Sequence, residues 1–238
     1  TPDFSKIDGP TLLAAVGQAF FSIGVGMGGM MTYGSYLPAN FSITRGAMMI
    51  VLADTMVALL AGFVVFPMVF NYGLDIAGGA GLIFQTLPVA FAQMPGGHVF
   101  AVLFFVMLSV AGVTSMVGLL ESVTSWTDQR TNLGREMSAV VVVGSVTFCS
   151  IASVLSYNVW QDVTLLGMNF NAASEGLYDK ITLPLGGLLI ALFVGWFMKR
   201  ELSFSELATG EQVFSIWHLL LRFVVVPAIA IILITGLI

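Results

Sequence analysis

The sequence predicts an all-α integral membrane protein with six transmembrane helices, the first of them broken in the middle of the membrane. Composition is the first observation behind this fold class. Charged residues make up 9% of the 238 residues and hydrophobic residues 58%, whereas a soluble domain has about 25% and 45–50%. So few charges cannot cover the surface of a water-soluble globule. Long charge-free stretches, and a cluster of glycines inside the first of them, are the second and third observations.

The composition also excludes several classes of function. A net charge of −5 leaves no basic face for nucleic acid. The single cysteine, Cys149, excludes an intrachain disulfide and is interpreted as a packing residue. The sequence shows no Ser/His/Asp, Cys/His or paired-carboxylate arrangement that points to catalysis, so we do not expect an enzyme.

A transmembrane helix needs about 20 mostly apolar residues to cross about 30 Å of hydrocarbon. The charge-free stretches from Gly9 to Thr44 and from Ile76 to Leu120 are too long for buried helices of a soluble fold. Their continuous apolar character, without alternation, argues against a β-barrel. Within a single transmembrane domain over 1–238 we expect spans at about 11–36, 46–72, 97–126, 137–157, 178–198 and 213–238.

Basic residues indicate the orientation of these spans. Those that follow the first, third and fifth spans are Arg45, Arg130, Arg135, Lys199 and Arg200. Lysine and arginine concentrate in cytoplasmic loops, so this side is predicted to be cytoplasmic and the N-terminus of the chain to lie outside. The stretch 73–96 is apolar but broken by glycine and proline, and we expect an outside loop, partly helical, folded back over the membrane domain.

Four glycines fall within six positions of the first span, at Gly24, Gly26, Gly28 and Gly29. Unwound backbone in lipid is tolerated only where it lines a polar cavity, and helices broken at the midplane are typical of transporter binding sites. A Gly24-x-x-x-Gly28 helix-packing motif is the alternative. The formal match to a dinucleotide fingerprint is rejected, because no strand precedes it and the next acidic residue is Asp54.

A few polar groups inside the spans are candidate ligands. Asp54 is costly at membrane depth and is expected to face a cavity, an ion or a partner charge, with an interfacial, snorkelling carboxylate as the alternative. Gln18 and Ser22 share one face of the first half-helix. Thr114 and Ser115 offer the hydroxyl oxygens that a hard cation such as Na⁺ prefers. Taken alone, hydrogen bonding of these hydroxyls to the preceding helical turn is the more common role.

Several runs resemble the neurotransmitter:sodium symporter family, in its bacterial amino-acid transporter branch. Ala15–Ser22, Gly24–Gly28 and Met31–Tyr36 resemble the sixth helix of that family, and Ala111–Glu121 resembles the eighth. Leu183–Leu189 with Val194–Trp196 is similar to the tenth. The resemblance implies helices six to eleven of the leucine-transporter fold, which are the second inverted repeat plus one extra helix. Helices one to five would form a missing N-terminal half, and this partial chain alone is expected to be inactive.

The resemblance also implies roles for individual residues. Phe21 would close over the substrate as an aromatic lid. The central substrate pocket would be lined by Phe21, Ser22, Gly24, Met27, Ser115 and Leu119. Two sodium sites are expected in the complete protein, the first with Ser22 and Asp54 and the second with the Ala111 carbonyl, Thr114 and Ser115.

One departure from the family pattern concerns chloride. The family usually has asparagine at the position of Asp54, and its chloride-dependent members bind the anion near Gln18, Ser22 and a serine at the position of Ala58. The Asp54 carboxylate would supply the negative charge that chloride supplies elsewhere. The resemblance therefore implies chloride-independent transport, in which Asp54 is a candidate for proton exchange.

The gates are transferred in the same way. Alignment on Leu183–Gly187 puts the acid of the outer gate at Glu175, where relatives more often have aspartate. The resemblance also implies Asp128 as the acid of the inner gate, offset by one residue from the usual spacing.

The function that the resemblance implies is sodium-coupled symport of an amino acid by alternating access. Because Phe21, Met27 and Leu119 are apolar, we expect a hydrophobic or aromatic substrate. The partners would be this substrate, the lipid bilayer of the bacterial inner (plasma) membrane and the missing N-terminal half, with no nucleic acid. A proton-coupled transporter of the same fold and a non-transporting membrane receptor or scaffold are the alternatives.

Overall fold

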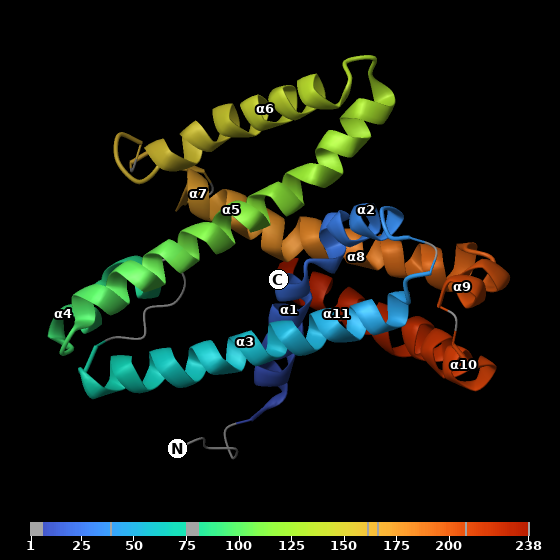
Figure 1. Cartoon of the computed structure of the whole chain (residues 1–238), viewed down its shortest axis with the longest axis horizontal. Coiled ribbons are helices and arrows are strands. Elements are labelled where there is room, and N and C mark those ends of the chain that lie inside the picture. The colour runs from blue at the N-terminus through green and yellow to red at the C-terminus, as the bar shows by residue number, and fades with distance from the viewer. Residues whose placement is uncertain are drawn as a thin grey trace. The chain divides into compact units, whose positions relative to one another are not determined.

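The computed structural model describes residues 7–38, 40–74, 81–160, 162–165, 167–207 and 209–237. The chain divides into two compact units, the first formed by Thr1–Met48 with Leu119–Ile238 and the second by Met49–Gly118. Helices make up almost all of both units (Figure 1). Residues 75–80 of the predicted outside loop lie outside the described residues.

The first predicted span consists of three short pieces: α1 (Gly9–Ile23), the 3₁₀ turn η2 (Val25–Met27) and α2 (Gly29–Ser35). Asp8 caps the start of α1, where its carboxylate accepts hydrogen bonds from the Thr11 hydroxyl at 2.6 Å and the Thr11 backbone N–H at 2.9 Å. Both hydrogen bonds favour the charged form and lower the pKa of Asp8.

The predicted break in the first span is present, because α1 ends at Ile23 and α2 begins only at Gly29.

The core of the second unit lies where two long helices meet a short helical segment. These are α3 (Ile43–Asn71), α5 (Gly97–Arg130), and between them the π-helical η3 (Leu82–Thr86) with α4 (Leu87–Gln93). Val69, Leu87 and Phe91 are buried together there, and the Phe91 ring lies 5.6 Å from that of Phe104. The described part of the stretch 73–96 thus packs as a helix against the end of α3 and the start of α5.

α6 (Arg135–Leu155) is followed by a small antiparallel hairpin, β1 (Thr164–Leu165) with β2 (Met168–Asn169). A continuous helical column then runs through α7 (Phe170–Leu177), η4 (Tyr178–Thr182), α8 (Leu183–Leu192) and η5 (Phe193–Phe197). This column begins at Phe170, earlier than the expected 178, because the Asn169 side chain caps it by accepting a hydrogen bond from the Ala172 N–H at 2.8 Å.

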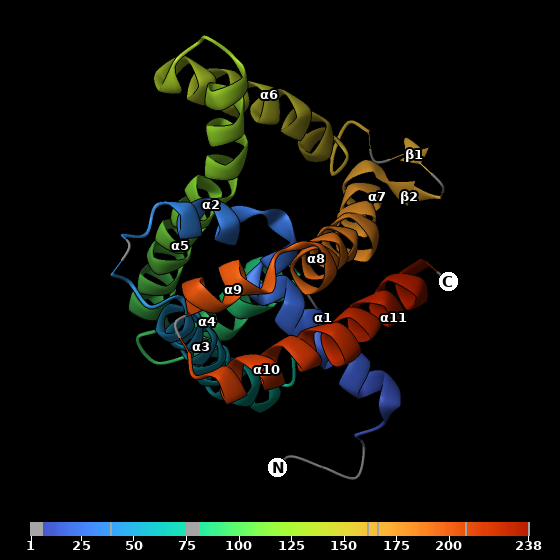
Figure 2. The same ribbon diagram turned by 90° about the vertical axis from the view of Figure 1, so that its right-hand side faces the viewer.

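The last segment comprises α9 (Arg200–Leu207), α10 (Glu211–Leu220), η6 (Leu221–Val225) and α11 (Val226–Leu237). α11 packs along α8 (Figure 2). Arg222 donates from Nε to the Gly195 carbonyl, and its guanidinium lies 5.4 Å from the centre of the Trp196 ring. The carbonyls in the last turn of a helix lack partners within the helix, and Arg222 caps one of them at the end of the column. The same contacts give the guanidinium charge of Arg222 polar and aromatic partners inside an apolar segment.

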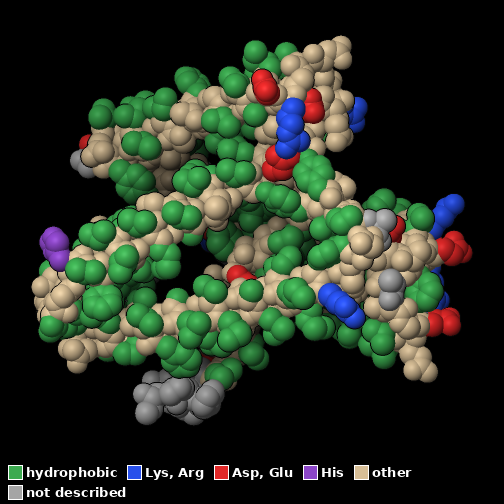
Figure 3. Space-filling view, viewed as in Figure 1, with side chains coloured by type: hydrophobic (Ala, Val, Ile, Leu, Met, Phe, Trp, Pro, Cys, Tyr) green, Lys and Arg blue, Asp and Glu red, His purple; other side chains and the backbone are tan. Residues whose placement is uncertain are grey.

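Five helical segments in the described residues are long and apolar enough to cross a membrane: 43–71, 97–130, 135–155, 170–197 and 211–236. With the broken first helix they give the six spans of an all-α integral membrane protein. Hydrophobic side chains cover the long helices, whereas charged ones gather at the α5–α6 turn and over α9 and α10 (Figure 3).

Candidate functional site

The break in the first span depends on two glycines in the left-handed conformation. Gly24 ends α1 with φ +70°, and its N–H donates back to the Phe20 and Phe21 carbonyls at 3.3 and 3.0 Å. Gly28 caps the start of α2 with φ +77°, and its carbonyl accepts hydrogen bonds from the Met31 and Thr32 N–H groups, both at 3.1 Å. A side chain at either position would be strained. The chain therefore leaves and re-enters the helix at defined points, with η2 between them.

The four pocket residues predicted in the first span lie on both sides of this break. Phe21 and Ser22 belong to the last turn of α1, Gly24 is its cap, and Met27 closes η2. The Met27 side chain folds back over Gly24, so that a Cβ added to Gly24 would lie 2.8 Å from Met27 Cε. Phe21 is 41% exposed and Met27 is half-buried, so both are accessible to a ligand beside the break.

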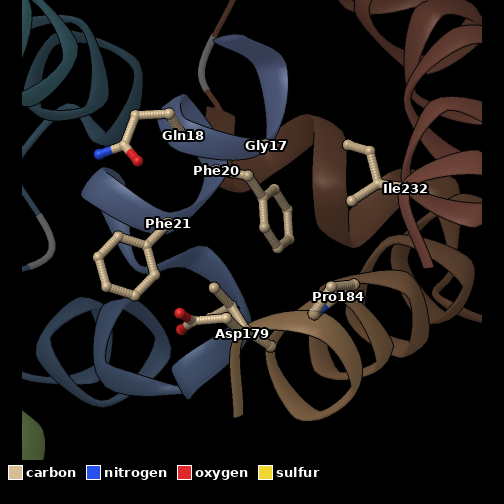
Figure 4. Close-up of a pocket in the computed structure, with 8 residues that line it drawn as sticks. Gly17, Gln18, Phe20, Phe21, Asp179, Pro184 and Ile232 are labelled. Atoms are coloured by element: carbon tan, nitrogen blue, oxygen red, sulfur yellow. The ribbon is translucent and has the colours of Figure 1, made fainter. Parts of the chain in front are cut away.

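A cleft of about 240 Å³ lies beside Phe21 in the first unit. Its lining comes from α1, the α7–α8 column and α11: Gly17, Gln18, Phe20, Phe21, Asp179, Leu183, Pro184 and Ile232. Figure 4 shows the Asp179 carboxylate turned toward the side of the cleft that carries Phe21. Glu175, the predicted gate acid, is exposed on α7, about one helical turn before Asp179. The sequence reasoning did not single out Asp179.

Other predicted ligands lie in the second unit. Asp54 is half-buried on α3 between exposed neighbours, and Ala58 follows it one turn later. On α5, Thr114 Oγ1 donates to the Ala111 carbonyl at 2.9 Å, which is the helical hydrogen bond considered as the alternative role. Two of the three predicted oxygen ligands, Thr114 Oγ1 and the Ala111 carbonyl oxygen, are thus 2.9 Å apart, close enough to contact one cation. The third predicted ligand, Ser115, is the next residue on that helix. The donor set is all oxygen, as a hard cation requires.

Ser115 and Leu119 lie one turn apart on α5, and Gln18 and Ser22 one turn apart on α1. Ser22 belongs to the first unit and Asp54 to the second. The three residues predicted for the second sodium site, Ala111, Thr114 and Ser115, all lie on α5.

A charged cluster joins three helices at the other end of α2. Glu121 Oε1 on α5 accepts hydrogen bonds from the Tyr36 hydroxyl at 2.6 Å and from Arg135 Nη2 at 2.8 Å. The Glu121 side chain is 14% exposed and that of Arg135 60%. Asp128, the predicted inner-gate acid, lies half-buried about two turns later on α5. Glu121 thus forms an ion pair with Arg135.

Comparison with known proteins identifies the family. The model of the sodium:neurotransmitter symporter family matches residues 1–238. A Bacillus subtilis protein, the uncharacterized sodium-dependent transporter YhdH, is 34% identical over 97% of this chain and 52% of its own length. The sodium-dependent dopamine transporter of Bos taurus is 30% identical over 93% of this chain and 33% of its own.

Among solved structures, the crystal structure of MhsT in complex with L-phenylalanine matches with a TM-score of 0.90 and 35% identity, over 99% of this chain and 54% of that one. The chain thus spans about half the length of YhdH and MhsT. The resemblance and the leucine-transporter fold expected from the sequence are confirmed: this chain belongs to the sodium:neurotransmitter symporter family.

Proposed function

We propose that this chain is part of a sodium-coupled symporter for a hydrophobic or aromatic amino acid, and that it supplies about half of the substrate and sodium sites. The observation that carries this proposal is the glycine-bounded break beside Phe21, Ser22 and Met27. At such a break the C-terminal end of one helix carries a partial negative charge and the N-terminal start of the next a partial positive one, which suit a cation and a carboxylate respectively. The family membership and the L-phenylalanine in complex with MhsT support the same substrate class.

In this proposal, Na⁺ is carried with the substrate and binds at two sites, with Ser22 and Asp54 at the first and Ala111, Thr114 and Ser115 at the second. Sodium binds better to the closed, substrate-occupied arrangement, and this difference in affinity couples the two fluxes. The chain would lie in a bacterial inner membrane with its N-terminus outside, beside a half that supplies helices one to five.

The proposal is tested with the complete transporter, which is this segment together with that preceding half, in proteoliposomes. Uptake of radiolabelled phenylalanine or leucine should require an inward Na⁺ gradient and persist without chloride. Uptake driven by a pH gradient without Na⁺ would instead support the proton-coupled alternative. Failure to bind either amino acid, with or without Na⁺, would support a receptor or scaffold.

Substrate size is expected to depend on Gly24. Replacing Gly24 with serine adds a Cβ within 2.8 Å of Met27 Cε at a residue with φ +70°, so Met27 must move into the space beside the break. We expect uptake of the largest aromatic substrates to fall about tenfold or more relative to small aliphatic ones, since a misfit of about 1.4 kcal/mol is a factor of ten. Competition by a series of amino acids measures this ratio. Gly144→Ala, where an added Cβ meets nothing within 4 Å, is the matched control, and an unchanged ratio in Gly24→Ser contradicts the assignment.

The outer gate is proposed to use a carboxylate of the α7–α8 column. Glu175 is the residue that alignment selects, and Asp179 is the one that lines the cleft beside Phe21. If Asp179 closes the cleft, Asp179→Asn should lower the apparent substrate affinity by about tenfold while Glu175→Gln changes it little, since losing one coupling contact costs about 1–3 kcal/mol. The reverse order would assign the gate to Glu175.

A further inference from the structure

At Gly26, the centre of the unwound turn η2, the nearest atoms of α8 are backbone atoms. A Cβ added to Gly26 would overlap the Leu183 carbonyl oxygen and lie 3.1 Å from the Gly187 nitrogen. A Cβ added to Gly186 would overlap the Gly26 carbonyl oxygen in turn. The two segments thus leave no room for a side chain between them, and a side chain at Gly26 or Gly186 would separate them.

Phe20 closes the same contact from the α1 side. A Cβ added to Gly187 would overlap Phe20 Cζ and lie 2.9 Å from Cε2, so the ring covers Gly187. Tandem glycines are unfavourable inside a helix, yet α8 carries them where η2 and Phe20 approach. The contact gives a specific reason for each glycine.

We propose that Gly186 and Gly187 are positioning residues, which fix the unwound turn through Gly26 and Phe20 so that the ligand groups of the break are held ready for substrate and sodium. Between Gly24 and Gly28 the chain has only three residues in one 3₁₀ turn, with glycine at both ends. Such a segment has large conformational freedom unless a neighbour holds it. Holding a site in its binding geometry raises affinity by removing this ordering cost. The inference rests on the proposed function for its transport readout.

The test uses Gly186→Ala and Gly187→Ala in the complete transporter, with Gly176→Ala as the matched control. Gly176 lies in the same helical column, and a Cβ there meets nothing within 4 Å. We expect the substrate KM and the Na⁺ concentration for half-maximal uptake to rise about tenfold or more in both test variants, within the usual range of coupling effects. A purely structural defect would lower the amount of folded protein and the Vmax, and would leave both constants unchanged.

A second-site variant separates the two contacts. Phe20→Leu removes the ring that a Cβ at Gly187 would overlap, so it should restore the KM of Gly187→Ala toward that of Phe20→Leu alone. It should not restore Gly186→Ala, whose obstacle is the Gly26 carbonyl oxygen. Rescue of both variants, or of neither, would overturn the proposed arrangement.

Hydrogen exchange tests the contact between η2 and α8 without a transport measurement. Amide exchange in the peptide covering 21–31 should speed up about tenfold or more in Gly186→Ala, which corresponds to about 1.4 kcal/mol of lost local protection, and not in Gly176→Ala. Unchanged exchange and unchanged KM in Gly186→Ala would refute the positioning role while leaving sodium-coupled transport intact. Faster exchange in a protein without sodium-dependent uptake would instead uphold the contact and refute the proposed function.

Discussion

Replacing Asp54 with asparagine is expected to abolish sodium-coupled uptake in chloride-free medium. In the proposal, this carboxylate both ligates the first sodium ion and supplies the charge that chloride supplies in related proteins. A unit charge about 4 Å from a monovalent cation contributes about 4 kcal/mol at an effective dielectric constant of about 20. Even if desolvation offsets a third of this, the affinity for Na⁺ should fall about a hundredfold. Sodium titration of uptake in proteoliposomes measures the loss.

A second substitution should restore the uptake that Asp54→Asn removes. Asp54→Asn combined with Ala58→Ser recreates the pattern of chloride-dependent members of the family, so uptake should return when chloride is present and disappear when gluconate replaces it. Ala58→Ser alone, which keeps the carboxylate, is the matched control and should stay chloride-independent. If Asp54→Asn retains full sodium affinity without chloride, Asp54 is not the charge that holds sodium.

The second large effect is expected at the cluster that joins α2, α5 and α6. Removing Arg135 leaves Glu121, which is only 14% exposed, without its counter-charge, whereas removing Glu121 leaves an arginine that is 60% exposed and readily hydrated. A poorly hydrated unpaired charge is the costlier defect. Arg135→Ala should therefore impair uptake more than Glu121→Ala, by about tenfold or more if the cluster stabilises one conformation of the transport cycle.

The double variant makes this comparison decisive. Glu121→Ala with Arg135→Ala should recover to the level of Glu121→Ala alone, because the unpaired carboxylate is gone. Tyr36→Phe, which removes the hydrogen bond of 2.6 Å but no charge, should have the mildest effect. Equal uptake in the two single variants, or a double variant as weak as Arg135→Ala, would show that the pair acts only as an exposed surface contact.

The sequence predicted the features of the fold that depend on local chemistry. The break was predictable because glycine is the residue that adopts a left-handed conformation without strain, and Gly24 and Gly28 both do so. The earlier start of the column at Phe170 was not predicted, because it depends on one capping side chain, that of Asn169, rather than on apolar length.

The candidate site was less predictable where side chains from distant segments meet. Asp179 was not predicted, because the alignment on Leu183–Gly187 selects Glu175. Asp179 lies in the π-helical η4, which has more residues per turn than an α-helix and so changes which side chains share a face. Glu121 and Arg135 are 14 residues apart, and their pairing depends on the geometry of the α5–α6 turn. In the sequence, Gly186 and Gly187 indicate only a segment with low helix propensity. Their contacts with Gly26 and Phe20, which account for both glycines, are visible only in the structure.

The backbone contact between η2 and α8 limits which amino-acid replacements this part of the chain can accept during evolution. Where two segments meet through main-chain atoms, every amino-acid replacement is a large step, because even a methyl group must separate them. Conservative exchanges that adjust packing by one methylene cannot occur there. If the proposed function holds, gradual change in substrate preference would instead arise at Met27, whose flexible thioether adapts at low cost.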